Sequence, residues 1–264
     1  MAKNAARSGT QAVERAMLLL RVLASAGRRG MRVADICAAA ALSQSTVSRI
    51  LLALEREGMV ERDHRTRRLF LGHVIHDLGL VARARLRMPE LCREAMRELA
   101  RITEDTIYLS EPSGSEAVCT AREDGAWPVK ALPLHVGVRR PMGVGAGGLA
   151  ILAALPPSRS AAILRRNAAR YPAYGGIDLS LLQRGIEQAR AQGWAHMANR
   201  ATAGMAAIGV PLIGPEGEPV AALSIAAINS RMQPDREAWL AGLLGDHCRA
   251  LTEQLQGLHQ AVAG

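Results

Sequence analysis

The sequence offers few groupings of residues that could carry out chemistry, and the first is a glycine-rich stretch. Residues 143–148 contain the pattern G-x-G-x-x-G, which holds a pyrophosphate in dinucleotide-binding enzymes. The pattern is specific only when a buried strand precedes it and an acidic residue follows about twenty positions later. Here residues 139–141 are Arg-Arg-Pro and residues 168–170 are Ala-Ala-Arg. A dinucleotide-dependent enzyme is therefore the disfavoured alternative.

Nucleophilic and metal chemistry have equally few candidates. No serine stands in a G-x-S-x-G pattern, and no cysteine belongs to a C-x-x-C pair or a catalytic signature. His73 and His76 share a helix face, but no further pair of ligands accompanies them. We expect no catalytic residue, no metal and no cofactor. The cysteines, which we expect to be buried thiols, are Cys37, Cys92, Cys119 and Cys248.

The positive charge of the chain is concentrated near its start. Residues 1–101 contain 19 Lys and Arg against 10 Asp and Glu, which accounts for the whole net charge of +9. A basic module followed by a neutral one predicts a polyanion binder joined to a part that binds no polyanion. The length of 264 residues also favours two domains. Because no apolar run approaches the roughly 20 residues of a membrane helix, we expect a cytoplasmic protein with no membrane partner.

The basic module predicts three helices from the spacing of its apolar residues. In the third, apolar residues recur from Val47 to Leu54 at helical spacing, Ser43 stands at the N-cap position and Gly58 ends the helix. The stripe must face the other helices, so the polar residues of the first turns point outward. Glutamine and arginine on such a face can bond base edges in a DNA major groove, and serine can bond phosphate. The three helices span residues 11–24, 33–40 and 44–57, and the outward residues are Gln44, Ser45, Ser48 and Arg49.

Two short strands are predicted after the third helix, at residues 59–62 and 68–71. The turn between them carries arginines that would lie close to the DNA backbone or the minor groove. These are Arg65, Arg67 and Arg68.

Four segments of this module, taken in order and spacing, resemble the winged helix-turn-helix of the IclR-type transcriptional regulators. They are residues 34–36, 42–49, 54–58 and 60–63, and the match ends at Leu71-Gly72. The resemblance implies an α+β protein with a winged helix-turn-helix domain over residues 11–72, a linker helix over 73–88 and a GAF-like effector-binding domain over 89–258. It further implies a homodimer or homotetramer that binds a double-stranded DNA operator under the control of a small-molecule effector. The DNA-binding residues it implies are Ser43, Gln44, Ser45, Thr46, Ser48, Arg49, Arg65, Arg67 and Arg68.

The neutral part predicts an antiparallel sheet flanked by helices. Strand-like runs alternate with stretches of helical spacing, and a Gly-Pro turn joins the last two strands. A DNA-packaging protein without a ligand would not need about 160 charge-neutral residues, so that alternative is disfavoured as well. The strands are predicted at 106–110, 117–121, 205–213 and 220–228, and the helices at 148–154, 158–170, 179–192 and 234–257.

The resemblance also implies an effector pocket. Family members that bind small carboxylates share a loop before a helix, an acidic residue, a cysteine on one late strand and two serines on the next. The loop matches here as Gly145-Ala146, whose backbone amides could meet a carboxylate. The other positions have mostly lost their polar groups, which predicts an aromatic or longer-chain acid rather than a very small one. The acidic residue, the cysteine and the two serines correspond to Met197, Ala207, Ser224 and Ala226.

Overall fold

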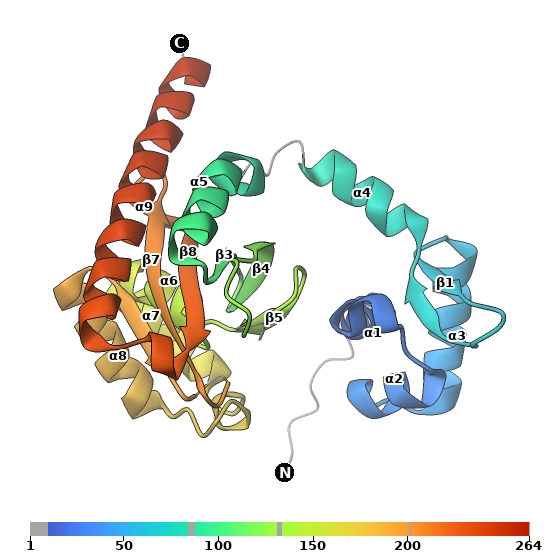
Figure 1. Ribbon diagram of the computed structural model, residues 1–264. Coiled ribbons are helices and arrows are strands. Elements are labelled where there is room, and N and C mark those ends of the chain that lie inside the picture. Colours follow the sequence, from blue (N-terminus) through green and yellow to red (C-terminus); the bar gives the residue numbers. More distant parts are fainter. Residues whose placement is uncertain (1–9, 84–87, 131–133, 201, 264) are drawn as a thin grey trace. The chain divides into compact units, whose positions relative to one another are not determined.

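The computed structural model describes residues 10–83, 88–130, 134–200 and 202–263 (Figure 1). The chain separates into two compact units, one ending at Arg87 and one beginning at Met88. Each has its own hydrophobic core. Of the predicted linker, residues 73–83 form a helix of the first unit, and residues 84–87 lie outside the described part.

The first unit is a bundle of three helices with a two-stranded hairpin beside it. Apolar side chains from all three helices and from both strands form its core, and Leu19, Ile36 and Leu51 are completely buried. The elements are α1 (Gln11–Ala26), α2 (Val33–Ala40), α3 (Gln44–Arg56), β1 (Val60–Arg62), β2 (Leu69–Leu71) and α4 (His73–Arg83).

Helix α3 begins where the sequence predicts and ends one residue earlier, at Arg56. The Ser43 hydroxyl accepts a hydrogen bond from the Thr46 amide at 3.4 Å, which caps the helix start. Gly58 follows the helix with φ near +66°, a left-handed conformation that favours glycine. Arg62 of β1 pairs with Glu55 of α3 at 2.5 Å and ties the hairpin to the helix.

The second unit is built on a six-stranded antiparallel sheet with the strand order β5-β4-β3-β8-β7-β6. Its strands are β3 (Thr106–Ser113), β4 (Glu116–Glu123), β5 (Arg139–Pro141), β6 (Ala195–Ala198), β7 (Met205–Ile213) and β8 (Pro219–Ile228). Its helices are α5 (Met88–Thr103), α6 (Ala146–Ala154), α7 (Pro157–Asn167), α8 (Leu179–Gln192) and α9 (Pro234–Ala263).

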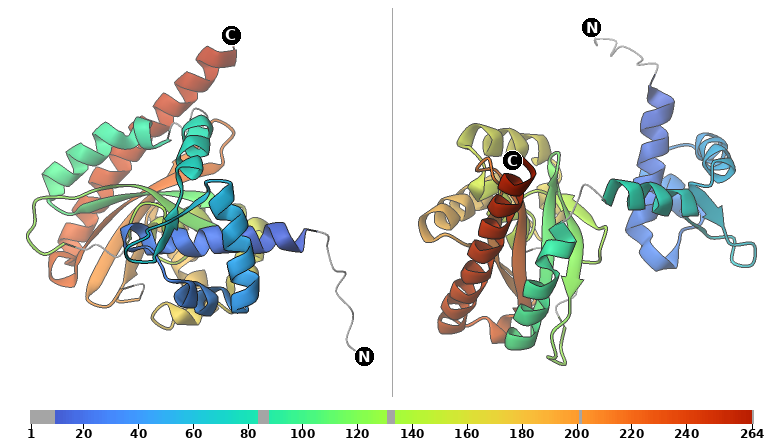
Figure 2. Two further views of the ribbon diagram at one scale, coloured as in Figure 1. Left: turned by 90° about the vertical axis from the view of Figure 1, so that its right-hand side faces the viewer. Right: turned by 90° about the horizontal axis from the view of Figure 1, so that it is seen from above.

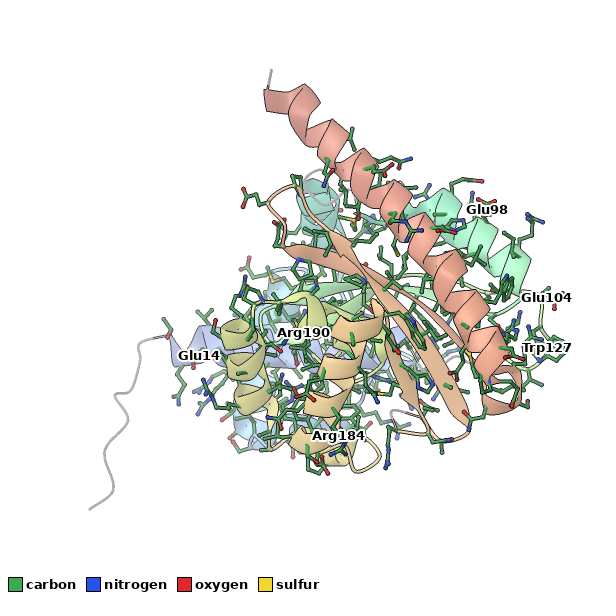
Figure 3. All side chains as sticks on the ribbon, turned by 90° about the vertical axis from the view of Figure 1, so that its left-hand side faces the viewer. Glu14, Glu98, Glu104, Trp127, Arg184 and Arg190 are labelled. Carbon is green, nitrogen blue, oxygen red and sulfur yellow. The ribbon has the colours of Figure 1, made fainter. Side chains whose placement is uncertain are left out.

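Helices cover both faces of this sheet. Strand β8 shows the division, because Leu223 and Ile225 pack with α5 and α9 whereas Ala222 packs with the core of α6 and α8. Figure 2 shows α5 and α9 side by side on their face. On the other face, Arg190 of α8 donates to the carbonyls of Ala153 and Leu155 at 2.9 and 3.0 Å and closes the end of α6 (Figure 3).

Most predicted elements are confirmed, and the differences have simple physical causes. Strands β5 and β6 were not predicted, because edge strands of three and four residues show too little alternation. Met88, which the sequence places at the end of the linker helix, instead begins α5, and Pro89 lies in the first turn of this helix, where proline loses no hydrogen bond. Among the described residues no single helix is long and apolar enough to span a membrane, and α2 with α3 meets that test only as a pair bent by 112°.

Candidate DNA-binding surface and effector cavity

The outward face of α3 carries the polar residues expected there. Gln44, Ser45, Ser48 and Arg49 are exposed, whereas Val47 between them is buried. Within the described part of the chain, the guanidinium of Arg49 makes no hydrogen bond or ion pair, so it is available to an external partner. This face can offer hydrogen-bond donors and acceptors to base edges.

Three of the candidate hydroxyls, at the N-cap and in the first turn of α3, lie within hydrogen-bond distance of one another through Ser43. The Ser43 hydroxyl lies 2.9 Å from the Thr46 hydroxyl and 3.2 Å from that of Ser45. Ser43 therefore has a structural role as the helix cap, whatever it contacts in addition. Thr46 is only half exposed.

The turn of the hairpin is organised by Asp63. Its carboxylate accepts hydrogen bonds from the amides of Arg65 and Thr66 at 3.0 and 2.6 Å, and these bonds lower the pKa of Asp63. The turn holds Arg65 and Arg67 exposed at its tip, and within the described residues neither guanidinium makes a hydrogen bond or an ion pair. The charge of Arg65 also helps to lower the pKa of Asp63. Both exposed guanidinium groups can reach a phosphate.

The third arginine of this turn lies differently from what the sequence suggests. The guanidinium of Arg68 donates to the carbonyl oxygens of Arg29 and Gly30 at 3.2 and 2.9 Å and is half-buried. It fixes the base of the hairpin to the connection between α1 and α2. These two hydrogen bonds give Arg68 a structural role. A sequence cannot distinguish an arginine that reaches outward from one that folds back onto the protein.

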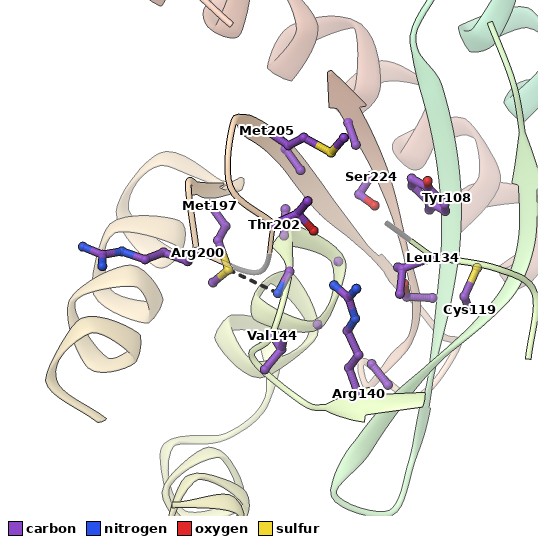
Figure 4. Close-up of a pocket in the computed structure, with 18 of the residues that line it drawn as sticks. Tyr108, Cys119, Leu134, Arg140, Val144, Met197, Arg200, Thr202, Met205 and Ser224 are labelled. Atoms are coloured by element: carbon purple, nitrogen blue, oxygen red, sulfur yellow. Dashed lines mark hydrogen bonds between the residues drawn. The ribbon is translucent and has the colours of Figure 1, made fainter. Parts of the chain in front are cut away.

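The candidate effector residues meet in one cavity of the second unit (Figure 4). The cavity has about 680 Å³ of space not filled by protein, part of which opens to solvent. Its wall comes from all six strands of the sheet, the start of α6 and the loops next to them. The six sequence candidates in this wall are Gly145, Ala146, Met197, Ala207, Ser224 and Ala226.

One part of the cavity is polar because α6 begins there. The N-cap residue Gly145 has no side chain to cap the helix, and the described residues accept no hydrogen bond from the amides of Ala146, Gly147 or Gly148. A Cβ added to Gly147 would lie 2.9 Å from the Ser110 hydroxyl and 3.5 Å from that of Ser224. These donors surround a small space suited to an anion.

Both hydroxyls are buried and have room for a ligand. Ser110 and Ser224 are each 6% exposed, and neither hydroxyl has a hydrogen-bond partner within the described chain. A buried hydroxyl without a partner costs free energy, which a bound acceptor would recover. Sequence reasoning missed Ser110, although it ends a predicted strand, because the family pattern contains no residue there.

Of the two amides expected to meet a carboxylate, one already has a partner. The Gly145 amide donates to the sulfur of Met197 at 3.2 Å (Figure 4). A thioether is a weak acceptor, so a carboxylate oxygen would compete with it effectively. Strand β7 can lie this close to the start of α6 because it has a glycine, Gly209, at the contact. A Cβ at Gly209 would lie 2.5 Å from the Ala146 carbonyl oxygen.

The remaining wall is mainly apolar. Tyr108, Cys119 and Ala226 form a small buried cluster against which Leu134 and Met205 pack. Burial raises the pKa of the Cys119 thiol to about 11, so the thiol is neutral at pH 7 and supplies no thiolate nucleophile. The wall can therefore bind an alkyl chain or an aromatic ring.

The glycine-rich stretch has a local role in this cavity. A short strand, β5, does precede it, which the sequence did not indicate, but β5 is an antiparallel edge strand. A dinucleotide site needs a parallel strand-helix-strand unit. Gly147 of this stretch lets the start of α6 lie close to Ser110, whereas Gly209 of β7 allows the close approach of that strand. Among the described residues no group of three or more His, Cys, Asp or Glu could hold a metal ion.

Comparison with known proteins covers nearly the whole chain. Residues 12–64 match the IclR helix-turn-helix domain, and residues 73–253 match the C-terminal domain of bacterial IclR transcriptional regulators. The HTH-type transcriptional regulator Rv1719 of Mycobacterium tuberculosis is 34% identical over 236 residues, which is 89% of each chain. The transcriptional repressor AllR of Klebsiella pneumoniae is 27% identical and covers 95% of this chain and 92% of its own.

Solved structures agree on the fold. An IclR-type regulator from Silicibacter superposes with a TM-score of 0.78 at 25% identity, over 93% of this chain and 96% of that one. An IclR homologue from Microbacterium hydrocarbonoxydans, complexed with 4-hydroxybenzoate, has a TM-score of 0.74 at 22% identity, over 94% and 100% of the two chains. The chain therefore belongs to the IclR family of transcriptional regulators, which bind DNA through the helix-turn-helix and an effector through the C-terminal domain.

Proposed function

We propose that this regulator responds to an aromatic or medium-chain carboxylic acid held in the cavity of its second unit. The observation that carries the proposal is the division of that cavity into two parts. The amides of α6 with the hydroxyls of Ser110 and Ser224 suit a carboxylate. The cluster around Tyr108 suits a ring or an alkyl chain.

A very small keto or hydroxy acid fits this cavity poorly. By resemblance, Met197, Ala207 and Ala226 stand where relatives that bind such acids have hydrogen-bonding side chains. A small polar acid would leave its oxygens without partners here, at a cost of several kcal/mol. The relative with bound 4-hydroxybenzoate supports an aromatic acid as the alternative class.

On the DNA side, we propose that Gln44, Ser45, Ser48 and Arg49 enter the major groove. Arg65 and Arg67 would then contact the phosphate backbone or the minor groove. All six side chains are exposed, which supports this assignment, and within the described chain those of Gln44, Ser48, Arg49 and Arg67 make no hydrogen bond or ion pair. As a protein that acts on chromosomal DNA, the regulator would work in the cytoplasm.

We also propose that the DNA-binding form is a homodimer, which could pair further into a tetramer. Val13 and Met17 lie one turn apart on α1 and are 62% and 47% exposed. Two large apolar residues on one face of a helix suit contact with a second copy. A dimer would read an operator with two related half-sites.

Thermal-shift screening of the full chain tests the effector proposal. We expect benzoate, 4-hydroxybenzoate, phenylacetate or octanoate to raise the melting temperature, and glyoxylate and pyruvate to have no effect. An acid that stabilises the protein should also change operator binding in a gel-shift assay. Stabilisation by glyoxylate or pyruvate alone would show that the cavity is built for small polar acids.

A further inference from the structure

The cavity wall contains a half-buried positive charge that the sequence did not single out, Arg140 on β5. Strand β5 pairs with β4 so that Arg140 lies opposite Ala117. Successive residues of a strand point to opposite faces. Arg139 binds Glu116 at 2.7 Å and the Ser113 hydroxyl at 2.8 Å, whereas Arg140 turns toward the cavity beside the small Ala117. The pairing of β5 thus fixes where Arg140 points.

The charges that line the cavity are all positive. Two arginines and no Asp or Glu occur among the described residues of its wall. Figure 4 shows Arg200 directed away from the cavity and Arg140 directed into it. Burial lowers the pKa of Arg140, and the nearby Tyr174, Tyr108 and Cys119 partly offset this decrease. Arginine nevertheless stays protonated at neutral pH, so the mostly apolar cavity holds a positive charge.

We infer that Arg140 makes this cavity select negatively charged effectors over neutral molecules of the same shape. The inference rests on the proposed function, because it concerns the same cavity. A guanidinium in weakly hydrated surroundings interacts strongly with a carboxylate, which can accept two parallel hydrogen bonds from it. The amide of the same acid keeps the shape and the apolar contacts but carries no charge.

The other polar groups of the cavity cannot make this distinction strongly. The hydroxyls of Ser110 and Ser224 and the amides at the start of α6 donate to a carboxylate oxygen and also to an amide oxygen. A full positive charge in a poorly hydrated site, in contrast, discriminates charged from neutral ligands by much more than one neutral hydrogen bond. The apolar wall would decide which acids fit, and Arg140 would require that the ligand be an acid.

Isothermal titration of the full chain with paired ligands tests the inference. The probes are benzoate, 4-hydroxybenzoate, phenylacetate and octanoate, each compared with its primary amide. We expect at least one acid to bind about 30-fold more tightly than its amide, and Arg140→Gln to reduce that ratio to about threefold or less. Arg140→Lys keeps the charge and should keep the preference for the acid at lower affinity. Arg166→Gln, on the exposed face of α7, is the matched control and should behave as the parent.

The possible results separate the inference from the proposed function. Amides that bind as tightly as their acids, or an Arg140→Gln protein that keeps the preference, would overturn the role of Arg140 and leave the cavity as an effector site. Binding of none of the eight probes would overturn the proposed effector class, and the inference with it. Thermal melting shows whether each variant is folded. If Arg140→Gln fails to fold, the affinity of Arg140→Lys for the acid is compared with that of the parent, which decides whether binding depends on the guanidinium.

Discussion

Arg49 has the longest side chain on the outward face of α3, and the described residues leave its guanidinium without a partner. If it reads a base edge with two hydrogen bonds, Arg49→Ala should cost about 1–3 kcal/mol at one base pair and relax the preference there. Gel shifts would compare a duplex selected by the protein from a random library with its single-base mismatches. Arg56→Ala, at the far end of the same helix, should leave the mismatch pattern unchanged. Parent-like discrimination by Arg49→Ala would remove this residue from the base-reading set.

Gly147 is a second residue with a specific consequence, because it leaves space between two hydroxyls. In Gly147→Ala the new methyl group would meet the Ser110 hydroxyl at 2.9 Å, in the polar part of the cavity. Alanine also favours a helix over glycine by up to about 1 kcal/mol. We expect a melting temperature near that of the parent and at least tenfold weaker binding of the acid found by screening, a loss of about 1.4 kcal/mol.

The matched control for this change is Gly242→Ala on α9, where an added Cβ meets no atom within 4 Å. It should bind the acid as the parent does. Full effector affinity in Gly147→Ala would mean that the ligand does not enter the space beside α6.

At the scale of elements, the proposed DNA contacts of Arg65 and Arg67 and the internal hydrogen bonds of Arg68 predict different effects of mutation. Arg65→Gln or Arg67→Gln should weaken binding to all duplexes alike and lower the slope of log K against log salt by about one. Arg68→Gln should instead lower the melting temperature, because the carbonyls of Arg29 and Gly30 lose their donor. Salt titrations by fluorescence anisotropy measure the slopes. An unchanged slope in the double variant Arg65→Gln/Arg67→Gln would mean that the tip only meets solvent.

The edge of the sheet depends on Glu116, which binds both Arg139 and Arg170 at 2.7 Å. Burial raises the pKa of Glu116, but the bonds and charges of these two arginines outweigh it, so the pKa is lowered from its ordinary value of 4.5. The stability from this ion pair network is present above pH 4.5 and is lost as the pH falls through the lowered pKa. Glu116→Gln should therefore destabilise the second unit by about 1–3 kcal/mol at pH 7. The difference should shrink in melts near pH 3, and a difference independent of pH would assign the effect to packing.

The elements that the sequence predicted are those with long periodic patterns. Val47, Leu51 and Leu54 mark the buried face of α3 over about two turns, and β7 was predicted with its observed bounds. The direction of the Arg140 side chain was not predictable. Arg140 lies on an edge strand of three residues, and the register in which that strand pairs with its neighbour decides which side chains face the cavity. The amino-acid sequence of so short a strand does not reveal the register. Ser110 was missed, and the contact of Arg68 with Gly30 was not foreseen, for a related reason, since both depend on a residue distant in sequence.

For the whole molecule, the chain carries its net charge in the part that would meet DNA. Residues 1–101 hold the full excess of +9, so the second unit is close to neutral. A neutral sensor does not compete with DNA for the basic surface, and an anionic effector has to be captured locally within its cavity. The charge count along the sequence predicts this division, and the loss of the family's polar groups at Met197, Ala207 and Ala226 predicts the ligand class.

The proposed dimer makes a further prediction for the whole molecule. Met17→Glu places a charge on the exposed apolar face of α1, so it should shift the protein toward the 28.2 kDa monomer and weaken operator binding. Sedimentation velocity measures the mass. Leu52→Glu, at a similarly exposed leucine on α3, should keep the parent mass. A Met17→Glu protein that still sediments as a dimer would place the interface elsewhere.

The two adjacent arginines of β5 make the proposed charge selection tolerant of variation in loop length. A one-residue slip that set Arg139 opposite Ala117 would exchange the faces of all β5 side chains, yet each face would still receive an arginine. One arginine could still bind Glu116, and the other would still enter the cavity. A short insertion or deletion between β4 and β5 could thus reshape the apolar wall without removing the positive charge. In the course of evolution, such a regulator could change which acid it senses before it ceased to sense acids.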